Sequence, residues 1–289
     1  MTKLSIIMPV FNEGATVLTA VKRVLFVDYP CPVELIVVDD GSVDSTAERL
    51  EGLAGPGVQV VRHQQNQGKG AAVRTGVDLA SGTHMIILDA DLEYSPGDIV
   101  AMLVPVAEGR VDHVFGARVF GMNTRFQSFR FAVGGRLLTL AANLLYDSCL
   151  TDLHTCLKLI PVTDFRSLSL SEDGFGFDTE LTARLLRAGV RPFEVPVAYH
   201  GRPFDEGKKI SWRDGLRCLL ILSRVRAERA VDIACIRRPV TSDGIPVAVP
   251  TSWTGVGTAQ NAGTAPVEIS GAEGIGPRDS GFNPPVVAL

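Results

Sequence analysis

The feature that most constrains the fold is an alternation of short apolar runs with amphipathic segments of helical length. Four runs have the length of strands buried on both faces, namely residues 4–10, 33–38, 58–62 and 85–88. After the first run, apolar residues from Val17 to Leu25 recur at i, i+3, i+4, i+7 and i+8, the pattern of an amphipathic helix. Strands that alternate with helices at this spacing predict an α/β fold with a parallel, doubly wound sheet. Further strands are expected over 112–115 and 190–199.

Residues 84–96 read HMIILDADLEYSP and combine a buried strand with a cluster of acids. Asp89 and Asp91 stand two residues apart at the carboxyl end of this strand, with Ala90 between them and Glu93 two residues on. Open α/β sheets bind ligands in the crevice beyond the carboxyl ends of their strands. Clustered carboxylates repel one another unless a cation lies among them, and hard oxygen ligands suit Mg²⁺ or Mn²⁺. The alternative is an acidic loop without a ligand, because D-x-D is common by chance.

Polar residues also follow the other expected strands. Glu13 comes after the first strand, Asp39 and Asp40 after the second, and residues 66–70 (NQGKG) after the third. Because the carboxyl ends of parallel strands meet at one edge of a sheet, these residues predict a single site. The NQGKG segment is either a glycine-rich helix start or a phosphate site made of backbone amides and Lys69.

Composition narrows the class of protein. The chain has 289 residues, a formal net charge of −4, 46% hydrophobic and 21% charged residues, which is ordinary for a globular protein and gives no case for nucleic-acid binding. Its five cysteines lack a C-x-x-C pair, which favours reduced thiols in a cytoplasmic protein. Leu4 to Val10 reads as a first strand and not as a signal segment. No transmembrane helix is expected, because charged and polar residues interrupt the longest apolar stretch, residues 131–150.

Four segments together resemble the motifs of family 2 glycosyltransferases with the GT-A fold: SIIMPVFNEG, ELIVVDDGSVDST, NQGKGAAVRTG and DADLEYSP. Over roughly residues 4–229 the chain is most similar to polyprenyl-phosphate glycosyltransferases, the relatives of dolichyl-phosphate mannose synthase. The resemblance implies a Rossmann-like, mostly parallel sheet with peripheral amphipathic helices. It also implies a metal-dependent hexosyltransferase that inverts the sugar's configuration. Its donor would be a nucleoside-diphosphate sugar of the GDP-mannose or UDP-glucose type, and its acceptor a polyprenyl phosphate such as a dolichyl, undecaprenyl or decaprenyl phosphate.

The resemblance also assigns residues to the donor and the metal. The implied nucleotide-sugar site comprises Pro9, Glu13, Asp39, Asp40, Asn66, Lys69 and Ala90. Asp89 and Asp91 match the D-x-D motif that binds Mg²⁺ or Mn²⁺ and the diphosphate. Glu93 falls where relatives often carry glutamine, and it would be the third metal contact.

The second half of the chain carries the expected acceptor residues. In the resembling enzymes, the arginines that match Arg118 and Arg136 bind the lipid phosphate, and an E-G-K-K loop that matches Lys208 and Lys209 closes over both phosphates. Two basic amphipathic helices, at about 125–147 and 211–229, fit a membrane interface. The alternative is that these helices are ordinary surface helices with a solvated basic edge.

The expected organisation is a catalytic domain over residues 1–238 and a tail over residues 239–289. The last 49 residues hold eight glycines and six prolines with little periodicity, which is typical of a disordered segment. The expected location is the cytoplasmic face of a membrane, as a peripheral protein. Two other functions remain open: transfer to a soluble acceptor such as a sugar phosphate, and a catalytically silent scaffold that binds nucleotide sugars.

Overall fold

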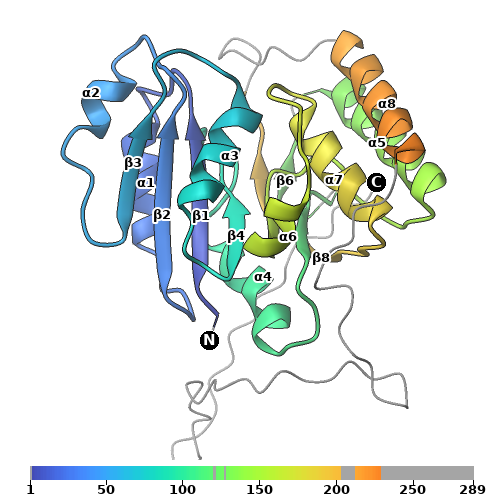
Figure 1. Cartoon of the computed structure of the whole chain (residues 1–289), viewed down its shortest axis with the longest axis horizontal. Coiled ribbons are helices and arrows are strands. Elements are labelled where there is room, and N and C mark those ends of the chain that lie inside the picture. Colours follow the sequence, from blue (N-terminus) through green and yellow to red (C-terminus); the bar gives the residue numbers. More distant parts are fainter. Residues whose placement is uncertain (1, 120–121, 127, 203–211, 229–289) are drawn as a thin grey trace, which may run out of the picture. The chain divides into compact units, whose positions relative to one another are not determined.

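The computed structural model describes residues 2–119, 122–126, 128–202 and 212–228 (Figure 1). Seven strands form one sheet in the order β3-β2-β1-β4-β7-β5-β8, and every neighbouring pair is parallel except the two pairs made by β7. The strands of this sheet are β1 (Leu4–Val10), β2 (Val33–Asp39), β3 (Val58–Arg62), β4 (His84–Ile87), β5 (Val114–Ala117), β7 (Lys158–Pro161) and β8 (Phe193–Pro196). The predicted doubly wound, mostly parallel sheet is confirmed.

Helices cover both faces of the sheet (Figure 1). The helices are α1 (Val17–Leu25), α2 (Thr46–Leu50), α3 (Lys69–Leu79), α4 (Asp98–Ala107), α5 (Phe129–Tyr146), α6 (Val162–Ser167), α7 (Phe177–Arg187) and α8 (Trp212–Ala227). Successive strand residues point to opposite faces, so Ile6 packs with α1 and α4 while Ile7 packs with α3 and α7. This alternation explains why the strands are apolar throughout: each of them supplies two core layers.

The central strands run close to α3 at Gly76. A Cβ atom at this position would lie 2.6 Å from the Cγ2 atom of Ile7, so only glycine permits this helix-to-strand distance without a shift. The close approach brings the amino end of α3, and with it Lys69, to the carboxyl edge of β1 and β4.

The sheet differs from the prediction in its second half. β7 was not expected as a strand, because the short apolar pair Leu159-Ile160 follows a polar loop and gives no periodicity. The strand expected over 190–199 is divided into β8 and β9 (Tyr199–His200), and β9 pairs with β6 (Thr124–Arg125) outside the main sheet. Proline cannot donate to the hydrogen-bond ladder, and β8 ends at Pro196.

Helices α5 and α8 lie where the sequence predicts helices at about 125–147 and 211–229, and they pack against each other and against α7. Within the described ranges, no helix has the length and apolar character needed to cross a membrane. The predicted tail over residues 239–289 lies outside the described residues, as do the domain boundary at residue 238 and the pair Lys208-Lys209.

Candidate functional site

The acidic loop after β4 lies at the carboxyl edge of the sheet, as the sequence predicts. Asp89 accepts a hydrogen bond from the ammonium of Lys69, with 3.0 Å between Nζ and Oδ2. Asp91 accepts one from the backbone N–H of Glu93 at 3.0 Å. Leu92 has a φ of 63°, a left-handed conformation that is uncommon for a residue with a side chain. This local turn brings Asp91 and Glu93 close together.

The loop concentrates negative charge. Burial and, after it, the charges of Asp89 and Glu93 raise the pKa of Asp91 to about 7. A hard divalent cation between Asp89 and Asp91 would relieve this repulsion, so the donor set fits Mg²⁺ or Mn²⁺. Across the described part of the chain, no three His, Cys, Asp or Glu side chains are grouped as a metal site. Asp89 and Asp91 as metal ligands thus remain a prediction from the sequence.

Glu93, the expected third metal contact, has both carboxylate oxygens engaged. Its Oε2 accepts a hydrogen bond from the Tyr199 hydroxyl at 2.8 Å, and its Oε1 accepts one from the backbone N–H of Arg202 at 2.7 Å. In this structure Glu93 thus ties β9 and the residues after it to the acidic loop.

Arg202 joins two of the predicted site residues. Its guanidinium donates to both oxygens of Glu13, at 2.7 and 3.2 Å, and lies 3.4 Å from Asp91 Oδ2. No local sequence pattern marks this arginine, which precedes the predicted E-G-K-K loop. Only the fold reveals that it lies between Glu13 and Asp91.

Lys69 is the centre of a chain of alternating charges. Its ammonium contacts Asp89 at 3.0 Å and Asp178 at 3.2 Å, and the other oxygen of Asp178 lies 3.4 Å from Lys158 Nζ. Although burial opposes it, the charges of Lys69 and Lys158 lower the pKa of Asp178 to about 2. Lys158 was not predicted as a site residue. It is the first residue of a strand that the sequence pattern does not reveal.

Three backbone N–H groups of the NQGKG segment form hydrogen bonds within the protein. The backbone N–H groups of Gln67 and Gly68 donate to the carboxylate of Asp40, at 2.9 and 2.7 Å, and Gly70 N–H donates to the carbonyl of Asp173 at 2.6 Å. Gly68 has a φ of 100°, which favours glycine. The Lys69 ammonium also has partners, since it contacts Asp89 and Asp178.

The expected nucleoside residues lie beside this loop. Asp40 also pairs with His63 at 2.7 Å, and Asp39 accepts from Ser42 N–H at 2.9 Å and pairs with Arg62 at 3.2 Å. Both aspartates are almost fully buried and hold the turn after β2. Of the other predicted residues, Pro9 is partly exposed in β1, Asn66 is exposed and Ala90 is buried.

Of the two expected acceptor arginines, Arg118 contacts Tyr199, which in turn contacts the acidic loop. It follows β5 and forms a bidentate ion pair with Asp152, at 2.5 and 2.9 Å. Its guanidinium also lies 4.9 Å from the ring centre of Tyr199, whose hydroxyl contacts Glu93. Arg136 is exposed on α5.

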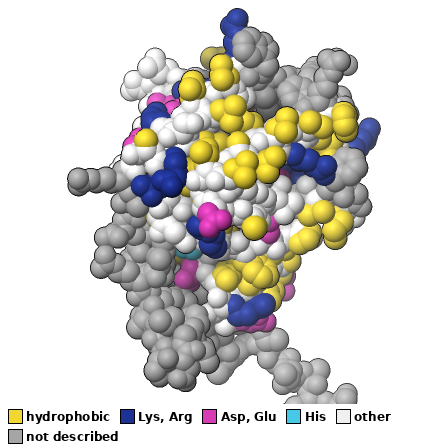
Figure 2. Space-filling model, turned by 90° about the vertical axis from the view of Figure 1, so that its right-hand side faces the viewer, with side chains coloured by type: hydrophobic (Ala, Val, Ile, Leu, Met, Phe, Trp, Pro, Cys, Tyr) yellow, Lys and Arg dark blue, Asp and Glu magenta, His cyan; other side chains and the backbone are white. Residues whose placement is uncertain are grey.

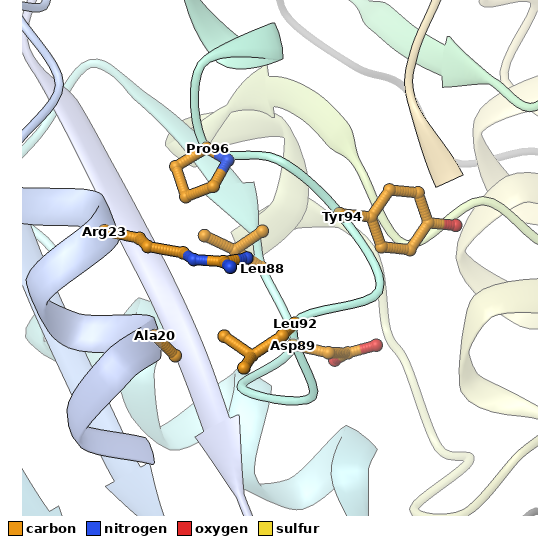
Figure 3. A pocket seen from close by; sticks show the side chains of 7 residues that line it. All are labelled: Ala20, Arg23, Leu88, Asp89, Leu92, Tyr94 and Pro96. Carbon is orange, nitrogen blue, oxygen red and sulfur yellow. The ribbon is translucent and has the colours of Figure 1, made fainter. Parts of the chain in front are cut away.

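A small hollow lies on the α1 side of the acidic loop (Figure 3). It is lined by Ala20, Arg23, Leu88, Asp89, Leu92, Tyr94 and Pro96. Figure 3 shows Arg23 reaching from α1 toward Leu88, whereas the Asp89 carboxylate points away from Arg23. The carboxylate therefore faces the Lys69 side of the loop, and the hollow itself is mostly apolar.

Two known proteins are similar to this chain in sequence. Glycosyltransferase AglJ of Haloferax volcanii is 31% identical over 201 residues, which are 68% of this chain and 63% of that protein. A dodecaprenyl-phosphate galacturonate synthase of Rhizobium johnstonii is 38% identical over 121 residues, 40% of this chain and 36% of that protein. The chain thus spans less than two thirds of the length of both relatives.

The fold is similar to that of glucosyl-3-phosphoglycerate synthase from Mycobacterium tuberculosis, crystallised with Mn²⁺, uridine diphosphate and glucosyl-3-phosphoglycerate. The TM-score is 0.59 at 21% identity, over 78% of this chain and 80% of that one. This similarity confirms the predicted fold class. The sequence model of glycosyl transferase family 2 matches residues 5–156, which is more than half of the chain. The chain belongs to glycosyl transferase family 2.

Proposed function

We propose that the protein transfers a hexosyl group from a nucleoside-diphosphate sugar to a polyprenyl phosphate, with the help of Mg²⁺ or Mn²⁺. Membership of the family supports the transfer itself. The name of the Rhizobium relative, a dodecaprenyl-phosphate galacturonate synthase, supports the class of acceptor.

The observation that supports a phosphate as the acceptor group is that the carboxylates near the site already have cationic or hydrogen-bonding partners. Those described at this edge of the sheet all pair with cations or accept hydrogen bonds, namely Glu13, Asp39, Asp40, Asp89, Asp91, Glu93, Asp152 and Asp178. A carboxylate that cations hold is a weak base, as the lowered pKa of Asp178 illustrates. Asp91 has a raised pKa, but a metal bound there would remove its basicity. An acceptor hydroxyl needs a base, whereas a phosphate oxyanion is already a nucleophile.

The residues at the donor end have complementary tasks. Asp89 and Asp91 would hold the metal, which supplies positive charge to the departing diphosphate. Lys69 offers an ammonium beside the same loop, and Arg202 neutralises Glu13 and Asp91. Rate enhancement would come from positioning and from charge, without a strong base.

The acceptor's lipid requires a membrane surface, and the face formed by α5 and α8 suits one. Seven large apolar side chains of these two helices are exposed, from 39% to 79%: Phe129, Leu137, Leu140, Leu144, Leu216, Leu219 and Leu220. Figure 2 shows hydrophobic side chains gathered with Lys and Arg between them on the side of the molecule that carries α5 and α8 in Figure 1. Apolar side chains with a basic rim favour peripheral binding to an anionic membrane.

The test is a transfer assay with purified protein and Mn²⁺. Radiolabelled nucleotide sugars are each offered two acceptors, a short, water-soluble prenyl phosphate and 3-phosphoglycerate. We expect label on the prenyl phosphate with at least one donor. Label on 3-phosphoglycerate alone would support a soluble acceptor. Donor binding without turnover on either acceptor would support a silent scaffold.

A further inference from the structure

Lys158 is a fully buried lysine, with 0% of its side chain exposed. Its ammonium donates to the backbone carbonyl of Thr155, lies 3.4 Å from Asp178 Oδ1 and lies 5.5 Å from the ring centre of Phe115. An isolated buried ammonium is strongly disfavoured, so it persists only with an anionic partner. Asp178 is the carboxylate within ion-pair distance, and its other oxygen accepts from Lys69.

The pair links two elements that the sequence keeps apart. Lys158 begins β7, next to β4 in the sheet, and Asp178 lies in the first turn of α7. Lys69, in turn, begins α3 and contacts Asp89 after β4. Four side chains of alternating charge thus form a row that begins in the acidic loop and ends in the core: Asp89, Lys69, Asp178 and Lys158.

We propose that Lys158 and Asp178 are positioning residues that fix the ammonium of Lys69 beside Asp89, where it meets a metal-bound diphosphate. This inference rests on the proposed function, because it assigns a diphosphate to that end of the site. A lysine side chain loses conformational freedom when it is ordered. The buried pair orders Lys69 before the ligand arrives, so less of this freedom remains to be lost on binding.

The loop that ends at Lys158 also serves the acceptor side. It contains Asp152, which holds Arg118 in a bidentate ion pair. One short segment therefore orients a cation on each side of the acidic loop, Lys69 through Asp178 and Arg118 directly.

The test measures the binding of Mn²⁺ with pyrophosphate by calorimetry, so that neither the nucleoside nor the acceptor enters. Asp178→Asn alone leaves Lys158 buried without an anion and can fail to fold, so the decisive variant is Asp178→Asn with Lys158→Met. This double variant removes both charges together and should melt within a few degrees of the wild type. We expect its affinity to be about tenfold weaker, close to that of Lys69→Ala, because Lys69 is no longer held in place and must be ordered when the ligand binds. Adding Lys69→Ala to the double variant should weaken binding no further.

A matched control removes another ion pair at the opposite end of the sheet. Lys3 and Glu34 lie 3.1 Å apart there, and Lys3→Met with Glu34→Gln should leave the affinity unchanged. Wild-type affinity in the Asp178→Asn, Lys158→Met variant, or a fully additive loss with Lys69→Ala, would overturn the positioning role while the proposed function stands. A wild-type protein that does not bind the probe would overturn the donor site and this inference together.

Discussion

At the scale of single residues, Asp91 has a conflict between stability and function. It is partly buried beside Asp89 and Glu93, and its pKa is raised to about 7. A raised carboxyl pKa means that the folded state disfavours the ionised form, so stability falls as pH rises from about 4 to about 7. Asp91→Asn should abolish turnover, because an amide is a poor ligand for a hard metal ion. Because the variant also removes the disfavoured buried charge, it should stabilise the metal-free protein at pH 8, by roughly 1–3 kcal/mol.

Thermal unfolding with and without Mn²⁺ checks this prediction. The gain from Asp91→Asn should shrink toward pH 4, where the wild-type carboxyl is protonated. Mn²⁺ should stabilise the wild type and leave the variant unchanged. Turnover near the wild-type level at saturating metal would show that Asp91 is no ligand.

Variants of Arg136 distinguish between two roles for this residue, binding of the acceptor phosphate and binding of the membrane surface. Arg136→Ala should lower kcat/KM for the acceptor about ten- to a hundredfold if the guanidinium binds the phosphate, and Arg136→Lys should recover part of it. The defect should persist with the short prenyl phosphate. Loss of the defect with that acceptor would make Arg136 an interface anchor. Arg49→Ala, an equally exposed change on α2, is the control.

The sequence predicted those site residues that a local pattern marks. Asp89 and Lys69 each stand at a strand end or helix start, and parallel strands bring such positions to one edge. Arg202 and Lys158 carry no such mark. Arg202 is 189 residues from Glu13, and Lys69 is 109 residues from Asp178. Contacts over such separations depend on how the whole sheet is wound, which periodicity does not record.

At the scale of elements, α8 shows how an amphipathic pattern can be divided between two tasks. Arg217 and Arg224 belong to the predicted basic helix at about 211–229, and both pair with Glu172, at 2.7 and 3.2 Å. Arg224 also lies 3.3 Å from the fully buried Glu180 of α7. These arginines therefore dock α8 on its neighbour, while Leu216 and the other outward leucines stay exposed. The helix was predicted correctly, but the partners of its charges were not.

The exposed face of α5 and α8 yields a prediction on membrane binding. Leu137 and Leu144 are 61% and 77% exposed, so replacing both with serine should leave the fold intact. Binding to vesicles that contain anionic lipid should fall about tenfold or more, since the variant lacks two apolar side chains that would be buried in the membrane. Leu25→Ser with Phe26→Ser, at the end of α1 and just after it, is the matched control, because these residues are 57% and 94% exposed. Equal vesicle binding in both variants would remove α5 from the interface.

At the scale of the whole molecule, the two core layers follow from binary patterning, whereas the antiparallel insertion of β7 into the sheet does not. Acid stability depends on buried polar groups that patterning does not reveal either. His154 is such a group, with its Nε2 3.2 Å from the Thr179 hydroxyl. Burial, followed by the charge of Lys158, lowers the pKa of His154 to about 4. The unfolded chain has an ordinary histidine pKa near 6.5.

This difference predicts a specific window of acid destabilisation. Between about pH 6.5 and pH 4 the unfolded state binds a proton at His154 that the folded state does not bind, so stability falls as the pH falls. The loss is at most about 3 kcal/mol. In His154→Gln, urea unfolding should depend less on pH across this window. His200→Gln, at an exposed position, should keep the wild-type slope. Buried carboxylates add to acid unfolding in all three proteins, so the difference between the curves isolates His154. Parallel curves for wild type and His154→Gln from pH 6.5 to 4.5 would show that this histidine titrates alike in both states.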